Sequence, residues 1–536
     1  YHLEGGVDTP GLEIFPGDVY MSIAALRGAA RAHGREFAAF SAMICQGGCY
    51  SIEELWFKKH KLSLYYSYMS GADIVATQYG AFDLEVRRTA HSLLEDKPFG
   101  VKSRRVREHV KTAMDFFEFC KSHPRPGGGP KVSLGILHGN LDGNAGLWIP
   151  WVWGQRGDEA NWKHGDPERA WNYLYQLHKR EPWYCRSLEG HNDFSGNPPD
   201  GQYDIVPVEA DLGALSRYRC LVMLGWNTMT PDIYDKLKEY VAAGGHLIMA
   251  VPHLSTQTKR SDPIKLLNDG DFRDLFGVVV KGKGAEVTAG HKFIAESSIK
   301  GYQFPQWGTH DPVLINGEYP LAEIEVHDAK ILCQSKGTYY TPEIHPTGPV
   351  LVENRIGKGA ALLITSWCYP GRKEMELFVR ELLKDISTGE QSRIKLSGSD
   401  MIRYAVYEED GLTTIYLLNT DYEAPGSTNL WIGKKVVPNV TIDSCQMRIV
   451  YLRKACLCIP RDRSVHVEGI NVSKGRCEFL LVGAGKQTID LYPLTGSLKK
   501  ARFNGKAVKV ESDNKPERVR VTVKLSGKVD VLKLTR

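Results

Sequence analysis

Long apolar runs, a strong net charge and nucleotide-binding motifs are all missing from this sequence. No apolar stretch approaches the roughly 18–20 residues that a helix needs to span a bilayer, so no membrane partner is expected. The 68 basic and 63 acidic residues leave a net charge of only +5, which gives no argument for nucleic-acid binding. There is no P-loop, no GxGxxG after a strand and no kinase-like motif set. We therefore expect no nucleotide cofactor.

The cysteines lack the spacing of a metal site. Cys456-x-Cys458 and Cys45-x-x-x-Cys49 are followed neither by a second pair nor by histidine ligands, so no metal is expected. An odd total of 11 favours reduced, buried thiols in an intracellular protein. The sequence opens at Tyr1 without Met and without a signal-peptide pattern, so the N-terminus itself does not indicate a compartment.

The length predicts several domains. At roughly 150 residues per domain, 536 residues suggest about three, and 42% hydrophobic and 24% charged residues are typical of globular proteins. The Pro/Gly run at 123–130 predicts a linker, because such a run continues neither helix nor sheet. We place the domains at 1–122, 132–390 and 391–536, with the linker at 123–131.

Residues 1–122 alternate between helical and strand patterns. Residues 20–33 and 62–69 are predicted helices, and 37–42 and 74–77 are predicted strands. A further helix is predicted to use Val106, Val110, Ala113, Met114 and Phe117 as its apolar face. Such alternation predicts a parallel sheet covered by helices. Since a (β/α)8 barrel takes about 250 residues, this region corresponds to the last two or three units of one.

The middle region predicts a doubly wound α/β domain with an open parallel sheet. Strands are predicted at 132–137, 219–225, 246–251 and 361–365. Thr230 is a predicted N-cap followed by proline, and Gly244-Gly245 ends that helix. After about residue 390, helical periodicity disappears and short β-rich runs recur between turns. That pattern predicts an all-β sandwich.

This domain order resembles family 42 β-galactosidases and related clan-A glycoside hydrolases. The local likeness lies in Tyr218-Arg219-Cys220-Leu221-Val222-Met223-Leu224 and in 240–248, 271–278 and 357–360. These segments resemble the trimerisation domain of those enzymes, which is itself similar to class I glutamine amidotransferases. The resemblance implies a carbohydrate substrate and a homo-oligomer, either a trimer or a dimer.

The resemblance also implies a mechanism with two carboxyl groups, one protonating the leaving oxygen and one acting as nucleophile or base. The strand expected to carry the nucleophile runs on into Ser41–Gln46 and has no carboxylate there. Glu4, which we expect to follow a strand at 1–3, is therefore our first catalytic candidate, because Gly5-Gly6 lets a ligand approach closely. Glu13 is the second, and Asp8 is a third carboxylate expected to bind substrate. Each could equally be a surface loop residue.

Other side chains are candidates for substrate binding. Gln46, Gln78 and Tyr79 follow predicted strands, at the end of a barrel where active sites form. Trp148, Trp151 and Trp153 form a tryptophan-rich segment, and sugars pack their C–H faces on aromatic rings. Turn formation and interdomain packing are the alternative interpretations of these residues.

Two other functions stay open, and a third lacks its nucleophile. A non-catalytic carbohydrate-binding or structural protein with a degenerate barrel would account for the missing carboxylate. A glycoside phosphorylase would need a phosphate site, for which Arg27, Arg31, Arg87 and Arg88 are candidates. An amidotransferase would need a nucleophile on a strained turn, and the turn after 246–251 has neither Cys nor Ser. The middle domain is thus predicted to be a scaffold.

Overall fold

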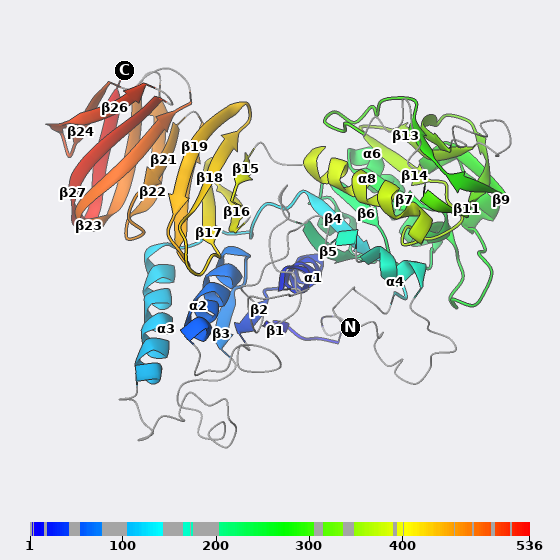
Figure 1. The fold of residues 1–536 in the computed structure, drawn as a ribbon, viewed down its shortest axis with the longest axis horizontal. Coiled ribbons are helices and arrows are strands. Elements are labelled where there is room, and N and C mark those ends of the chain that lie inside the picture. The colour runs from blue at the N-terminus through cyan, green and yellow to red at the C-terminus, as the bar shows by residue number, and fades with distance from the viewer. Residues whose placement is uncertain are drawn as a thin grey trace.

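A computed structural model describes residues 5–14, 19–41, 54–77, 104–142, 165–171, 203–304, 315–335, 348–389, 394–399, 401–454, 456–473, 476–494, 499–514 and 517–535, with Leu3, Tyr173 and Leu174. These residues form three parts along the chain (Figure 1). The first two combine helices and strands, and the described elements of the third are all strands. The prediction of a multidomain α/β protein that ends in a β-rich module is confirmed at this level.

The first part is a three-stranded parallel sheet with helices between its strands. The strands lie in the order β1-β2-β3, and both pairings are parallel. The elements are β1 (Gly11–Ile14), α1 (Val19–Ala32), β2 (Ala38–Ser41), α2 (Glu54–Met69), β3 (Ile74–Thr77) and α3 (Arg104–Ser122). Gly71, with a φ of +107°, follows the end of α2 as predicted, because glycine adopts this conformation without steric cost.

The apolar face predicted for α3 is wrong. Val110, Met114 and Phe117 are 36%, 53% and 58% exposed, whereas Phe116 and Phe119 are buried. The rings of Phe116 and Phe119 lie 5.2 and 5.0 Å from that of Tyr65 on α2. The helix has apolar residues on both sides, and contact with α2 decides which side is buried.

The second part is built on an eight-stranded sheet in the order β10-β12-β13-β14-β7-β6-β4-β5. The elements of this sheet and its helices are β4 (Leu134–His138), α4 (Asp166–Trp171), β5 (Tyr203–Pro207), α5 (Leu212–Leu215), β6 (Cys220–Met223), α6 (Pro231–Ala243), β7 (His246–Ala250), α7 (Arg273–Phe276), β10 (His291–Phe293), β12 (Lys330–Ser335), β13 (Pro349–Ile356), β14 (Gly359–Ile364) and α8 (Glu376–Gly389). The unit β6-α6-β7 is as predicted: the Thr230 hydroxyl accepts from Ile233 N at 3.3 Å, and Gly244 caps the helix with a φ of +125°.

The prediction of an all-parallel sheet is only partly right. The run β14-β7-β6-β4-β5 is parallel, but β10, β12 and β13 pair antiparallel at one edge. A second sheet, antiparallel, is made of β8 (Asp271–Phe272), β9 (Val278–Ala289) and β11 (Ile315–Val326). Antiparallel edge strands are common on doubly wound sheets.

The third part has two sheets. The smaller has the order β15-β18-β19 and packs on the larger, ten-stranded sheet, enclosing an apolar core that includes Ile415, Leu417 and Leu430. The elements are β15 (Ile394–Gly398), β16 (Ile402–Glu409), β17 (Leu412–Asn419), β18 (Gly426–Ile432), β19 (Lys435–Ile442), β20 (Met447–Arg453), β21 (Cys456–Pro460), β22 (His466–Ser473), β23 (Arg476–Pro493), β24 (Lys500–Phe503), β25 (Lys506–Val508), β26 (Val510–Asn514) and β27 (Glu517–Thr535).

The predicted linker contacts both the first and the third part. Arg125 donates to the carbonyl of Tyr68 on α2 at 2.6 Å, and the Pro130 carbonyl accepts from a side chain of α1 at 2.6 Å. Lys131 N donates to the carbonyl of Val406 on β16 at 2.7 Å. The segment is therefore bound along its length, and one apolar core continues through all three parts.

Two further findings concern the described residues only. None of the eight cysteines among them forms a disulfide. None of the described helices is long and apolar enough to cross a membrane.

Candidate functional site

The carboxyl ends of β1, β2 and β3 meet at one edge of the first sheet. The register pairs Leu12 with Ala39 and Ala39 with Val75, so that Ile14, Ser41 and Thr77 end the strands side by side. The Ser63 hydroxyl on α2 donates to that of Ser41 at 2.7 Å, which fixes α2 against the sheet. In parallel β/α proteins this edge is where catalytic side chains gather.

The strand predicted at 1–3 is wrong at its last residue, because Leu3 lies in a turn. The Leu3 carbonyl accepts a hydrogen bond from Gly6 N at 3.1 Å. The strand that pairs with β2 is Gly11–Ile14, because Gly5-Gly6 and Pro10 interrupt the chain before it and Gly11-Leu12-Glu13-Ile14 alternates in polarity. Glu13 therefore lies near the carboxyl end of β1, in register with Phe40. The reason for ranking Glu4 above Glu13 is lost.

The other predicted site residues divide into two groups. Asp8 is described: its carboxylate is 82% exposed and lies 3.0 Å from the Arg35 guanidinium, as in an ordinary surface ion pair. The rest lie outside the described residues, namely Glu4, Gln46, Gln78, Tyr79, Trp148, Trp151 and Trp153.

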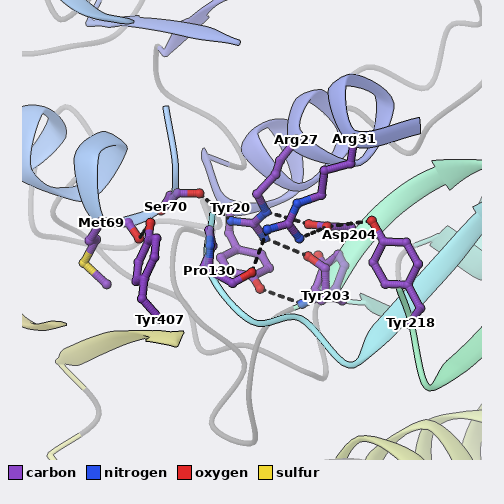
Figure 2. A network of polar contacts seen from close by, with 10 residues as sticks. All are labelled: Tyr20, Arg27, Arg31, Met69, Ser70, Pro130, Tyr203, Asp204, Tyr218 and Tyr407. Carbon is purple, nitrogen blue, oxygen red and sulfur yellow. Dashed lines mark hydrogen bonds and ion pairs between the residues drawn. The ribbon is translucent and has the colours of Figure 1, made fainter. Parts of the chain in front are cut away.

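A buried polar network joins the first part to the central sheet (Figure 2). Arg27 and Arg31, one turn apart on α1, point at Asp204 on the edge strand β5, at 2.6 and 2.7 Å. The Tyr218 hydroxyl donates to the same carboxylate at 2.8 Å. Burial alone would raise the pKa of Asp204, but the charges of Arg27 and Arg31 outweigh it and hold that pKa below its usual value.

The network requires α1 and β5 to lie very close together. A Cβ placed on Gly28 would lie 1.9 Å from the Ile205 carbonyl oxygen, so glycine is needed at this crossing. Tyr20, on the same helix, accepts a hydrogen bond from Tyr203 N at 2.8 Å. Because both arginines are committed to Asp204, Arg27 and Arg31 do not form the phosphate site considered for a phosphorylase. Arg87 and Arg88 lie outside the described residues.

A second place for ligand binding is the crevice between the carboxyl ends of β4 and β6. The chain leaves these neighbouring strands in opposite directions, toward β5 and toward β7, which makes this the switch point of the sheet. The described parts of the loops that follow β4 and β6 are joined by hydrogen bonds. Asn140 N donates to the Asn227 side chain at 3.0 Å, and Thr228 N donates to the Asn140 carbonyl at 3.0 Å.

Charged and aromatic side chains fill the space beside this crevice. Arg260 pairs with Glu168 and lies 3.6 Å from Asp142, while its guanidinium stacks 4.9 Å from the Trp226 ring. Asp142 accepts from the Trp171 indole at 3.3 Å. The two carboxylates and both tryptophans are 1–3% exposed. This cluster was not predicted from the sequence; Trp226, which directly follows the strand predicted at 219–225, was the available signal.

The turn after β7, where an amidotransferase would hold its nucleophile, holds His253 instead. Its Nδ1 accepts from Ala250 N at 2.9 Å, and its Nε2 lies 3.3 Å from the Leu224 carbonyl oxygen. Burial lowers the pKa of His253 to about 4, so the imidazole is neutral. Cys220 is fully buried on β6. Within the described ranges, no group of three or more His, Cys, Asp or Glu side chains could hold a metal ion.

Comparison with known proteins identifies the middle of the chain. Residues 199–389 match the family model described as β-galactosidase trimerisation domain. No curated protein matches the chain. Solved structures that it resembles include β-galactosidases from Bacillus circulans sp. alkalophilus (14% identity, TM-score 0.49) and Rahnella sp. R3 (13%, 0.49). An α-L-fucosidase from Paenibacillus thiaminolyticus follows at 13% and 0.45.

Coverage in these matches is unequal. The match spans 82%, 84% and 100% of this chain, but 59%, 61% and 66% of the three solved chains in the same order. The chain thus spans about three fifths of the length of the β-galactosidases.

Proposed function

We propose, on the premise that residues 199–389 are a β-galactosidase trimerisation domain, that this chain is part of a homo-oligomeric glycoside hydrolase acting on β-linked saccharides. The family match is the observation that carries the proposal. The contacts between Asn140, Asn227 and Thr228 support it, because the described residues at the switch point bond to one another, as suits a scaffold that holds subunits together.

In this proposal, the chemistry belongs to the carboxyl edge of the first sheet. Glu13, near the end of β1, is the leading candidate for nucleophile or acid/base, and Glu4 is the second. Each would act with another carboxyl group across the scissile bond. Two parallel βαβ units with their ends aligned are consistent with the end of a (β/α)8 barrel. The three tryptophans at 148–153 are proposed to contact the sugar.

The test of this function is hydrolysis of chromogenic aryl β-galactosides, with aryl α-fucosides and β-mannosides as comparison substrates. We expect turnover of at least one β-glycoside that does not depend on inorganic phosphate. Turnover that requires phosphate would indicate a phosphorylase. Binding of saccharides without any turnover would favour a non-catalytic protein with a degenerate barrel.

The assembly is tested separately. We expect a homo-oligomer, a trimer or else a dimer, with residues 203–389 at the subunit boundary. Light scattering coupled to size-exclusion chromatography at micromolar concentration measures the mass directly. A monomer of 60.0 kDa would contradict this part of the proposal without affecting the chemistry.

A further inference from the structure

A groove runs along the rim of the C-terminal part, where the smaller sheet ends and the larger sheet continues. The smaller sheet ends at its edge strand β19, whereas the larger one extends past it through β21, β23 and β27. Two adjoining hollows of about 300 and about 410 Å³ lie along this edge. They share Asp443, Arg448 and Arg461 in their walls, so the two hollows form one groove.

Strand alternation explains why the groove is charged. Val450, Ile459 and Tyr492 belong to the apolar core beneath the smaller sheet. Two residues beyond each of them, and so on the same face of the larger sheet, stand Arg448, Arg461 and Asp490. This face of the larger sheet thus changes from apolar to charged where the smaller sheet ends.

Positive charge exceeds negative charge in the groove. Its walls contain four arginines, Arg448, Arg461, Arg463 and Arg518, against three aspartates. One of the aspartates, Asp490, is already neutralised by ion pairs, because Arg461 and Arg520 contact its two oxygens at 3.0 and 2.7 Å. The groove therefore keeps an excess of positive charge.

Among the described residues, Arg448 has no carboxylate within ion-pair distance. Its one hydrogen bond is long, 3.4 Å to the Arg461 carbonyl. Burial lowers the pKa of Arg448, and Asp443 offsets this only in part. An anion in the groove would satisfy the remaining guanidinium donors, because guanidinium and carboxylate or sulfate form paired hydrogen bonds.

The opposite wall offers polar groups before it reaches Asp443. It is formed by β19, whose Asn439 and Thr441 are exposed at the groove. Asn439 has a φ of +56°, so the edge strand is locally irregular and does not present a regular ladder for strand pairing. Amide and hydroxyl groups at this spacing suit the hydroxyls of a sugar.

We infer that this groove binds an acidic oligosaccharide, with a carboxylate or sulfate group on Arg448 and neighbouring sugar hydroxyls on Asn439 and Thr441. The saccharide part of the inference rests on the proposed function, whereas the anion part does not. The groove would hold a charged glycan on the C-terminal module, apart from the proposed catalytic edge of the first sheet.

Calorimetric titration of the full chain tests this inference. The probes are oligogalacturonides for carboxylate, sulfated galacto-oligosaccharides for sulfate, and neutral galacto-oligosaccharides of the same length. We expect at least one acidic probe to bind more tightly than its neutral counterpart, with an affinity that falls as salt is raised. Arg448→Gln should weaken that binding at least about 10-fold, the scale of one charged hydrogen bond.

Two further variants make the result decisive. Arg461→Gln alters a 47% exposed side chain, so it should fold normally and also weaken binding. Arg476→Gln removes an equal charge from an exposed position at the opposite end of β23 and should bind like the wild type. Equal affinities in wild type, Arg448→Gln and Arg461→Gln would overturn the inference. So would equal binding of neutral and acidic probes.

Hydrolysis of a neutral aryl β-galactoside, measured on the same variants, separates the two proposals. We expect Arg448→Gln to leave this rate unchanged. If no glycoside is hydrolysed but acidic saccharides bind through Arg448, the proposed function fails and the groove stands. If hydrolysis occurs and no acidic saccharide binds, the groove inference fails alone.

Discussion

Arg27 and Asp204, 177 positions apart in the sequence, form an ion pair of 2.6 Å in which both side chains are almost fully buried. The pair joins α1 of the first part to β5 of the central sheet (Figure 2). It explains how a short parallel sheet is held against a scaffold with which it shares no strand.

Asp204→Asn should strongly destabilise the protein. The substitution leaves Arg27 buried without its counter-charge, and breaking a buried pair in this way costs about 3–5 kcal/mol. The measurement is the midpoint of urea denaturation. Asp115→Asn, in the exposed pair with Lys111, is the control and should cost roughly 0–1 kcal/mol. Equal midpoints for the two variants would show that the buried network does not stabilise the junction.

Gly28→Ala should disturb the same junction without changing any charge. The added methyl group would meet the backbone of β5 at 1.9 Å, and backbone cannot yield as a side chain can. Overpacking of this kind costs roughly 1–3 kcal/mol or more, visible as a lower thermal midpoint. Gly469→Ala is the control, since its nearest neighbour would lie at an ordinary 3.4 Å. A Gly28→Ala protein as stable as the wild type would rule out the close approach of α1 and β5.

Glu13→Gln should reduce turnover of a responsive β-glycoside at least about 100-fold, because the amide can neither attack nor transfer a proton. Asp8→Asn is the matched control, with an exposed side chain before the same strand, and should keep near-normal kcat. Glu4→Gln is measured beside them. If Glu13→Gln is active and Glu4→Gln is not, the catalytic carboxylate precedes β1. Activity in both variants would place the chemistry elsewhere.

Stability should fall as the pH drops from about 6.5 toward 4. Burial lowers the pKa values of His138, His253, His291 and His466 to about 4, whereas the unfolded chain binds protons near 6.5. Above pH 6.5 the imidazoles are neutral in both states, and folding has its full stability. As the pH falls from 6.5 toward 4, protons bind to these histidines in the unfolded chain but not in the folded one, so stability is lost. We expect a lower thermal midpoint at pH 5 than at pH 7.

A variant checks the origin of this pH dependence. His291→Phe removes one of the titrating groups, so the difference between its midpoints at pH 7 and pH 5 should be smaller than in the wild type. The comparison uses each protein's own difference, which allows for any loss of stability at pH 7. A wild-type midpoint that does not change between the two pH values would contradict the buried neutral state of these histidines.

The central unit was predictable because its determinants are local. Thr230, Pro231 and Gly244 mark the ends of α6, and Ile233 and Leu237 are buried on the face that periodicity predicts. The first strand was misplaced because Leu3 and Leu12 both stand in short apolar-polar alternations. Only pairing with β2 selects Gly11–Ile14. The antiparallel edge of the sheet was missed because strand direction is set by partners and leaves no trace in periodicity.

The sequence by itself determined the helices with clear caps, the parallel strands with continuous apolar runs and the change to β structure near residue 390, since each depends on neighbours a few positions away. Tertiary structure alone decided that Arg27 and Arg31 bind Asp204 and that α3 buries Phe116 and Phe119. It also decided that Arg260, Glu168 and Asp142 come together beside the switch-point crevice. In these cases the free energy comes from contacts between residues distant in sequence, where burial and the cost of an unpaired charge select one arrangement among several that local patterns allow.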